Sequence, residues 1–510
     1  MKTLKSVIML LIAFQASVAQ GIQTYALNSA ASAQPPSNSI DALVASGDSL
    51  WIGTSKGLGL AVKGSAWKNF TNMTPFDDKG ISAIATKNGL TWTAIGYSVK
   101  RDGDYVQTGG GLNWSSDGGT TWTHVPQPVD VGTVDTLLYG SNKIPALAIT
   151  VPQQNITFDV ALAGGTVWIA SFAGMLRKST DFGITWNRVV LPPDNLNSIS
   201  PTDTLDFDLS PSGGTLGLRE NLNHRVFSVY ASNDSTLWAG TAAGINRSTD
   251  GGTSWTRFSH QNQASPISGN FVVAINGLTY QSKNMIWAAT VNALGEDEQQ
   301  GVSFSDDMGL TWSTTLLGER AHNISFKDSI VYVGTDRGVF RSGDYGESWI
   351  LNGTIVDQTT LQRFSSSPIY AVAIQGDTVW VGGPDGMAYT LDGAANLFGA
   401  TWKVFRTSES VLSSGNTYSY PSPFSPDDEI VRIHYALTGS SDVVTIRIFD
   451  FSMHPVRTLI QNAPRQSLSE YDEIWDGRTD NGSLATNGVY FYRVQLGDKD
   501  PQWGKIFVIR

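Results

Sequence analysis

An eight-residue pattern with serine, aspartate, glycine and tryptophan at matching positions occurs five times, and no other feature of the chain constrains the fold as strongly. The copies are SSDGGTTW (115–122), STDFGITW (179–186), STDGGTSW (248–255), SDDMGLTW (305–312) and SGDYGESW (342–349). Repetition of this kind indicates an array of similar structural units. In a tight turn, Asp and Ser can bond backbone amides, Gly can adopt positive φ, and Trp can pack into a sheet. We therefore interpret the motif as a structural turn. Its expected structural residues are Asp117, Trp122, Asp181, Trp186, Asp250, Trp255, Asp307, Trp312, Asp344 and Trp349.

A short apolar strand containing an aromatic residue precedes each copy, and counting these strands gives seven units. They are LWIGT (50–54), LTWTAIG (90–96), VWIAS (167–171), LWAGT (237–241), IWAAT (286–290), VYVGT (331–335) and VWVGG (379–383). The first unit keeps only the tryptophan of the eight-residue motif, and the seventh holds a stretched version, LDGAANLFGATW (391–402). Each unit reads as four short strands separated by turn signals, which is the size of a propeller blade. The sequence predicts an all-β fold with a seven-bladed β-propeller over 36–405.

The motif S-x-D-x-G-x-T-W resembles the Asp-box or BNR repeat of sialidases, sortilin-type receptors and photosystem II assembly factors similar to Ycf48. The resemblance implies a propeller but no particular activity, because one fold serves many functions. Sialidase chemistry would further imply three arginines that hold a carboxylate, the first in an F/Y-R-I-P motif near the first blade. The first arginine here is Arg101, in the second unit, and Phe340-Arg341 is followed by Ser-Gly. Xyloglucanase-like enzymes also carry these boxes and use two aspartates, but they resemble a pair of propellers, whereas one ring is visible here.

Composition excludes several kinds of site. The chain has no cysteine, and its six histidines show no zinc-motif spacing, so we predict no metal and no cofactor. The formal charge is −11 with scattered basic residues, which argues against nucleic acid as a partner.

The string Gly53-Thr-Ser-Lys-Gly57 matches G-x-S-x-G, but it lies between two predicted strands and is interpreted as a hairpin turn rather than a nucleophile elbow.

The first 19 residues have the features of a secretory signal peptide, with Lys2 and Lys5, an apolar run from Val7 to Phe14, and small residues up to Ala19. The apolar run is too short for a membrane-spanning helix. We expect an exported chain that begins with an N-terminal segment over 20–35, does not insert into a membrane and is a monomer.

A second domain is predicted after a polar linker over 406–417. Residues 418–510 contain alternating strands such as VRIHYAL (431–437) and VYFYRVQL (489–496), which predict an immunoglobulin-like β-sandwich. YPSPFSP (420–426), IFDFSMHPVRTL (448–459), WDGRTDNGSLATNGVYFYRV (475–494) and GKIFVIR (504–510) resemble FlgD-like Ig domains and the sorting domains of the type IX secretion system of Bacteroidetes. That resemblance implies the type IX machinery as a partner and the outer-membrane surface of a Gram-negative bacterium, or secretion, as the location. The alternative is a terminal spacer domain.

Long insertions mark one face of the predicted propeller. They occur between the second and third strands of a blade (97–110, 291–300) and between blades (123–157, 187–224, 351–367), and both kinds of connection lie on the face opposite the eight-residue turns. Loops are where scaffolds usually carry function. The candidate ligand-binding residues on this face are Lys100, Arg101, Asp104, Tyr105, Asp206, Asp208, Arg219, Glu220, Asp297, Asp336, Arg337 and Asp385, with His224 and Glu298 also noted. For each of them the alternative is a charge that merely solvates a loop.

Two functions fit these patterns. One is a non-catalytic propeller, secreted or on the cell surface, that binds an extracellular glycan or protein through the long-loop face. The other is a glycoside hydrolase that acts on extracellular polysaccharide with a carboxylate pair on that face. For the non-catalytic binding protein we predict no catalytic residue.

Overall fold

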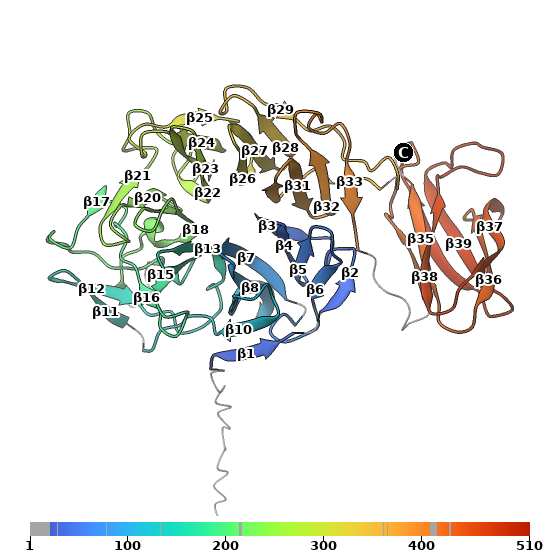
Figure 1. Cartoon of the computed structure of the whole chain (residues 1–510), viewed down its shortest axis with the longest axis horizontal. Coiled ribbons are helices and arrows are strands. Elements are labelled where there is room, and N and C mark those ends of the chain that lie inside the picture. The colour runs from blue at the N-terminus through green and yellow to red at the C-terminus, as the bar shows by residue number, and fades with distance from the viewer. Residues whose placement is uncertain are drawn as a thin grey trace, which may run out of the picture.

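The computed structural model describes residues 21–510 except 28, 78, 102, 133, 214–216, 361, 365, 408–415 and 428–429. The predicted signal peptide therefore lies outside the described residues, as does most of the predicted linker. The described chain is all-β, with seven radial sheets in a ring and a separate β-sandwich at the C-terminal end (Figure 1). The predicted fold class, a seven-bladed propeller followed by an immunoglobulin-like sandwich, is confirmed.

Each blade is an antiparallel sheet whose four strands run in chain order from the axis outward. Blade 1 contains β3 (Ile40–Ser46), β4 (Ser49–Thr54), β5 (Gly57–Val62) and β6 (Trp67–Phe70), and blade 2 contains β7 (Gly80–Lys87), β8 (Leu90–Arg101), β9 (Asp104–Ser115) and β10 (Thr121–Val125). Blade 3 contains β13 (Thr157–Ala163), β14 (Thr166–Ser171), β15 (Met175–Ser179) and β16 (Asn187–Arg188), and blade 4 contains β18 (Val226–Ala231), β19 (Leu237–Thr241), β20 (Gly244–Ser248) and β21 (Trp255–Phe258). Blade 5 contains β22 (Phe271–Tyr280), β23 (Lys283–Val291), β24 (Gly301–Ser305) and β25 (Ser313–Thr315), and blade 6 contains β26 (Ala321–Lys327), β27 (Ile330–Thr335), β28 (Gly338–Ser342) and β29 (Ile350–Leu351). Blade 7 contains β30 (Ala371–Gln375), β31 (Thr378–Gly383), β32 (Gly386–Leu391) and β33 (Lys403–Phe405).

The ring closes by side-chain packing and hydrogen bonds between blades 7 and 1, since each blade is built from consecutive strands. Ile40 and Leu43 of blade 1 share a core cluster with Ala371 and Trp380 of blade 7. The side-chain Nδ2 of Asn38 also donates to Thr407 O at 2.9 Å, and its side-chain Oδ1 accepts from Thr407 N–H at 2.8 Å.

Three further strands lie on the outer edges of blades. The N-terminal segment supplies β1 (Gln23–Ala26), which pairs with β10 of blade 2, and β2 (Ala30–Ser32), which pairs with β6 of blade 1. The edge of blade 4 is covered by β17 (Ser198–Ile199), which pairs with β21. These additions satisfy backbone groups that an open sheet edge would expose.

The five eight-residue turns share one hydrogen-bonding pattern. In each of them the Ser Oγ donates to the Asp Oδ1 at 2.7–2.8 Å and accepts the amide of the last turn glycine at 2.7–2.9 Å. The Asp then accepts the amide of the residue just before the Trp, at 2.9 Å. The two side chains thereby satisfy the amides of the turn between the third and fourth strands.

The same turns also join neighbouring blades. The last turn glycine packs against the preceding blade, and in blades 4 and 6 it meets the second-strand tryptophan there, so that a methyl group on Gly252 would lie 2.4 Å from Cη2 of Trp168. At Gly346 a methyl group would lie 2.7 Å from Cη2 of Trp287. Both glycines also have positive φ, at +80° and +92°, which other residues rarely adopt. Each of these turns therefore closes its own hairpin and packs on the blade before it.

The blade 5 turn contains two adjacent aspartates that allow a matched test. Asp307 accepts Thr311 N at 2.9 Å and Thr311 Oγ1 at 2.6 Å, whereas Asp306 is exposed. Slight burial by itself would raise the pKa of Asp307, but the hydrogen bonds from Thr311 and Ser305 lower it overall. We expect Asp307→Ala to lower the free energy of unfolding in urea by about 1–2 kcal/mol, because the turn amides lose a charged acceptor. Asp306→Ala should change it by less than about 0.5 kcal/mol, and equal effects of the two changes would contradict the assigned role.

The C-terminal part is a sandwich of two antiparallel sheets. One sheet contains β34 (Thr417–Tyr420), β35 (Val431–Leu437) and β38 (Ser469–Trp475), and the other contains β36 (Asp442–Phe449), β37 (Pro455–Arg465), β39 (Gly488–Leu496) and β40 (Gln502–Val508). Trp475, Tyr435 and Tyr492 are fully buried between the sheets. The guanidinium of Arg432 donates to Thr360 O at 2.5 Å, which links the sandwich to the insertion over 351–367.

Candidate ligand-binding face

The insertions extend from the face on which the first strand of each blade begins, here called the long-loop face. Residues 97–110 continue β8 and β9 into one long hairpin whose tip carries Arg101 paired with Asp104 and Lys100 paired with Tyr105. The Tyr105 side chain is 74% exposed. The hairpin therefore presents an aromatic side chain to solvent at its tip.

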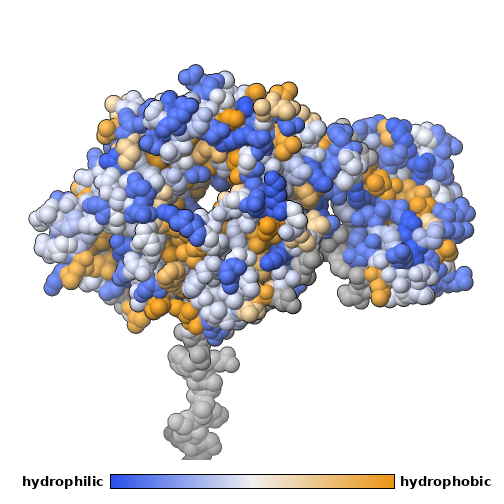
Figure 2. All heavy atoms as spheres, in the orientation of Figure 1, coloured by the Kyte–Doolittle hydropathy of each residue, from blue (hydrophilic) through white to orange (hydrophobic). Residues whose placement is uncertain are grey.

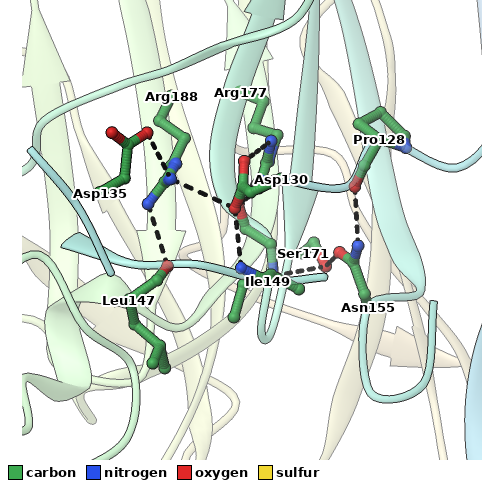
Figure 3. A network of polar contacts seen from close by, with 10 residues as sticks. Pro128, Asp130, Asp135, Leu147, Ile149, Asn155, Ser171, Arg177 and Arg188 are labelled. Atoms are coloured by element: carbon green, nitrogen blue, oxygen red, sulfur yellow. Dashed lines mark hydrogen bonds and ion pairs between the residues drawn. The ribbon is translucent and has the colours of Figure 1, made fainter. Parts of the chain in front are cut away.

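The insertion over 123–157 is held by a buried ionic network (Figure 3). Asp130 accepts two hydrogen bonds from the Arg177 guanidinium at 2.9 Å each and lies 3.3 Å from Arg188 Nη2. Arg188 also donates to Leu147 O at 2.9 Å. Burial alone would raise the pKa of Asp130, but the hydrogen bonds and charge of Arg177 lower it, with help from Ile149 N–H and Arg188. This network fixes the insertion, including its hairpin of β11 (Val134–Tyr139) and β12 (Asn142–Leu147), to the third and fourth strands of blade 3.

The insertion over 187–224 ends in the short 3₁₀ turn η2 (Leu222–His224), and two of its residues are completely buried. Asn223 exchanges hydrogen bonds with the Asn246 side chain at 2.8 and 2.9 Å. Nδ1 of His224 accepts Ser210 N–H at 3.0 Å, and its Nε2 lies 3.2 Å from Leu191 O. Burial lowers the pKa of His224 to about 4. His224 thus anchors the loop as a neutral imidazole.

Most of the predicted ligand-binding residues have partners in their own loop or in a neighbouring one. Arg219 pairs with Asp206 and Asp208, Arg337 pairs with Glu319, and Glu220 pairs with Arg225. Asp385 forms an ion pair with Arg406 where blade 7 ends. Glu298 accepts the amides of Ala293, Asn270 and Gly295 and so closes the loop over 291–300, and Asp297 stands next to it there. The insertions therefore bring these residues to one face but do not gather them into one site.

A large concave feature among the described residues is the axial channel, with a volume of about 900 Å³. The innermost strands of all seven blades line it, and Figure 2 shows the opening near the middle of the ring. One of the predicted residues reaches its wall indirectly, because Asp336 hydrogen-bonds through Oδ1 to Nε2 of the channel residue His322 at 2.6 Å. The channel mouth on the long-loop face is therefore the candidate site.

A β-bulge recurs near the start of the first strand in blades 1 to 6 and projects one residue per blade into this mouth. In blade 7, Tyr370 stands at the corresponding position just before β30. The seven residues, here called the bulge ring, are Asp41, Ser82, Phe158, Phe227, Val273, His322 and Tyr370. Sequence reasoning missed them because they share no residue type. Their spacing was a usable signal, since five of them stand equally far before the second-strand aromatic of their unit.

Two carboxylates on the channel wall, Asp41 and Asp159, have pKa values raised by desolvation, but they differ in how open they are to a ligand. Asp41 opens to the channel, yet protein surrounds it on most sides, and this desolvation raises its pKa to about 6. Asp159 follows the bulge of blade 3, and burial raises its pKa to about 7 although it accepts Val160 N–H at 2.8 Å and Val229 N–H at 2.9 Å. Asp159 thereby connects blades 3 and 4, which leaves Asp41 as the carboxylate more open to a ligand.

Comparison with known proteins gives remote similarities. No family model matches the chain. A curated xyloglucanase of Hypocrea jecorina (strain QM6a) is 22% identical over 329 residues, covering 59% of this chain and 34% of the relative. The chain thus spans about a third of the length of that protein.

Among the solved structures that resemble the chain are the following three, each at a TM-score below 0.5. PorZ of Porphyromonas gingivalis, described as an essential bacterial surface component of the type IX secretion system, gives a TM-score of 0.39 at 14% identity and covers 92% of this chain and 65% of its own. YCF48 from Cyanidioschyzon merolae gives 0.42 at 15% identity over 73% of this chain and 98% of its own. The GH74 enzyme of Niastella koreensis gives 0.48 at 13% identity over 94% of this chain and 74% of its own. The fold described above rests on the strand pairing of the chain itself.

Proposed function

We propose that the protein is a non-catalytic propeller, secreted or on the cell surface, that binds an extracellular glycan or protein through the long-loop face. The observation that carries this proposal is the coincidence of two features on that face. The insertions extend from it, and the bulge ring lines the channel mouth at its centre. Concave sites with a few convergent polar groups are where proteins usually bind ligands.

We further propose that the C-terminal sandwich serves type IX secretion or surface attachment. Its support is the resemblance of its motifs to sorting domains. In the described part of the chain there is no helix with the length and apolar character needed to cross a membrane. Deleting 418–510 should leave the propeller in the periplasm of the producing cell, as measured by fractionation. Normal export of the truncated chain would favour a spacer domain.

A glycoside hydrolase is the second candidate, and Asp41 is the observation that favours it. A carboxyl group with a pKa near 6 can act as a general acid near neutral pH. Glycoside hydrolysis ordinarily needs a second carboxylate, and both oxygens of Asp159 already accept backbone hydrogen bonds. The geometry therefore supports binding better than hydrolysis.

One experiment separates the two candidates. The purified protein is run through gels that contain different polysaccharides, and the same mixtures are assayed for new reducing ends. We expect retention without release. Release that disappears with Asp41→Asn would overturn the non-catalytic assignment. A protein ligand is tested by photo-crosslinking in producing cells. The cross-linked products from a photo-reactive amino acid at position 105, on the hairpin tip, are compared with those from one at position 182, in a turn of the opposite face.

A further inference from the structure

The channel mouth on the long-loop face has an aromatic side. Phe227 of the bulge ring lies at the centre of a phenylalanine cluster, with ring centroids 5.4 Å from Phe158, 4.5 Å from Phe271 and 6.2 Å from Phe172. These four residues, here called the aromatic arc, come from the consecutive blades 3, 4 and 5. All four side chains are partly exposed. The arc therefore offers ring surface to the mouth rather than to a closed core.

The other side of the mouth is polar. Asp41, His322 and Tyr370, here called the polar arc, come from blades 1, 6 and 7, which are consecutive around the ring and lie across the channel from blade 4. His322 and Tyr370 contact each other edge to face, with centroids 5.1 Å apart. Asp41 accepts a hydrogen bond from Ser39 Oγ at 3.3 Å. Carboxylate, imidazole and phenol together can both donate and accept hydrogen bonds.

The charge of the mouth limits what can bind there. Among the described residues that line the channel, the basic side chains are Lys87 and His322. Lys87 ends β7, away from the mouth, and is 3.0 Å from Asp234, while His322 is bonded to Asp336. The nearby Arg225 guanidinium lies over the Phe172 ring at 5.1 Å and is paired with Glu220. The described residues that line the mouth thus present a carboxylate and no uncommitted cation, which disfavours an anionic ligand there.

We propose that the channel mouth binds a short stretch of uncharged saccharide, with a pyranose ring against Phe227 and its hydroxyl groups toward the polar arc. A pyranose has a face of C–H groups that packs on an aromatic ring and an edge of hydroxyl groups that must keep hydrogen-bond partners when water is displaced. The axial channel behind the mouth has a volume of about 900 Å³, which gives room for a few sugar units. This inference rests on the proposed function and narrows its ligand from glycan or protein to neutral glycan.

Titration calorimetry with the full exported chain tests the assignment. The ligands are neutral hexasaccharides (cello-, laminari-, manno- and chito-oligosaccharides and a xyloglucan oligosaccharide) and an oligogalacturonate of the same length. We expect at least one neutral ligand to bind and Phe227→Ala to weaken its binding by tenfold or more. The matched control is Phe182→Ala, since Phe182 is 49% exposed in a turn of the opposite face, and this change should alter binding by less than twofold.

Further variants keep the assignment falsifiable. Phe227→Leu preserves apolar volume, so a folded Leu variant that binds as weakly as the Ala variant would show that the aromatic ring is what the ligand requires. Failure of every neutral ligand to bind, tighter binding of the oligogalacturonate, or unchanged affinity with both Phe227 variants would overturn the saccharide site. The variant Tyr105→Ala distinguishes failure of the mouth site from failure of the proposed function. If Tyr105→Ala abolishes saccharide binding and Phe227→Ala does not, the mouth is not the binding site but the long-loop face still is. If neither change affects binding, both the mouth site and the proposed function of the long-loop face are wrong.

Discussion

Replacing Asp130 by alanine is expected to lower the free energy of unfolding by about 3–5 kcal/mol, among the largest effects of any single substitution in the protein. The Arg177 and Arg188 side chains are each 3% exposed, and they are direct cross-strand neighbours on β15 and β16. Asp130 lies between them (Figure 3). Without its carboxylate, the buried Arg177 guanidinium loses its ion-pair partner, Arg188 keeps only its pair with Asp135 at 3.1 Å, and Ile149 N–H loses its acceptor at 2.8 Å. The penalty comes mainly from the buried Arg177 charge left without a carboxylate rather than from the lost attraction alone.

The measurement is urea denaturation followed by tryptophan fluorescence, with limited proteolysis of the insertion over 123–157 as a local readout. Lys87→Ala is the control, because the Lys87–Asp234 pair is exposed, at 44% and 69%, and exposed pairs contribute about 1 kcal/mol or less. The double variant Asp130→Ala with Arg177→Met should be less destabilised than the sum of the single changes, since both remove parts of one network. A loss for Asp130→Ala no greater than that of the control would contradict this account.

The architecture could be predicted because its determinants repeat. A turn such as 248–255 uses the same Ser, Asp, Gly and Trp in every copy, and each residue has a local reason for its position, either a hydrogen bond or contact with a tryptophan. Seven second-strand aromatics then count the blades even where the turn itself has diverged. Local patterns of this kind are visible in a single sequence.

The candidate site was only partly predictable. The long-loop face was inferred from insertion lengths, but the charged residues named on it are mostly committed to neighbours, as Arg337 is to Glu319 and Asp208 is to Arg219. These partners lie 18 and 11 residues apart along the chain, in irregular loops without a repeating pattern, so a single sequence does not show them. Phe227 and Asp41 were missed because the pattern of alternating burial in a strand does not predict a β-bulge. It is the bulge that turns each of these side chains into the channel.

The buried polar anchors were also beyond sequence reasoning. His224 was named as a loop residue, but its burial depends on the whole insertion over 187–224 folding back on blades 3 and 4, with Phe207 and Leu209 in the core beneath it. An insertion of this length reads as polar and variable. In the structure it contributes part of the hydrophobic core.

The stability of this anchor is expected to depend on pH, and His224→Gln should remove that dependence. The pKa of His224 is about 4 in the folded protein, against about 6.5 in the unfolded chain, because burial disfavours the imidazolium. Protonation of Nδ1 would also turn an acceptor into a donor facing Ser210 N–H. The unfolded state therefore binds the proton more readily as pH falls through 6.5. The contribution of His224 is fully present above pH 6.5, and up to about 3 kcal/mol of it is lost by pH 4.

Denaturation of wild type and His224→Gln at pH 7.5, 6.5, 5.5 and 4.0 measures this difference. The variant should be less stable at pH 7.5, since it loses a hydrogen bond, and the stability difference should shift by about 3 kcal/mol in favour of the variant toward pH 4. Subtracting the variant matters because Asp41 and Asp159, with raised pKa values, act in the opposite direction and lose stability as pH rises toward 7. His454→Gln is the control, because the side chain of His454 is 78% exposed in the C-terminal sandwich. A gap that stays constant from pH 7.5 to pH 4 would mean that His224 takes up a proton without disturbing the loop it anchors.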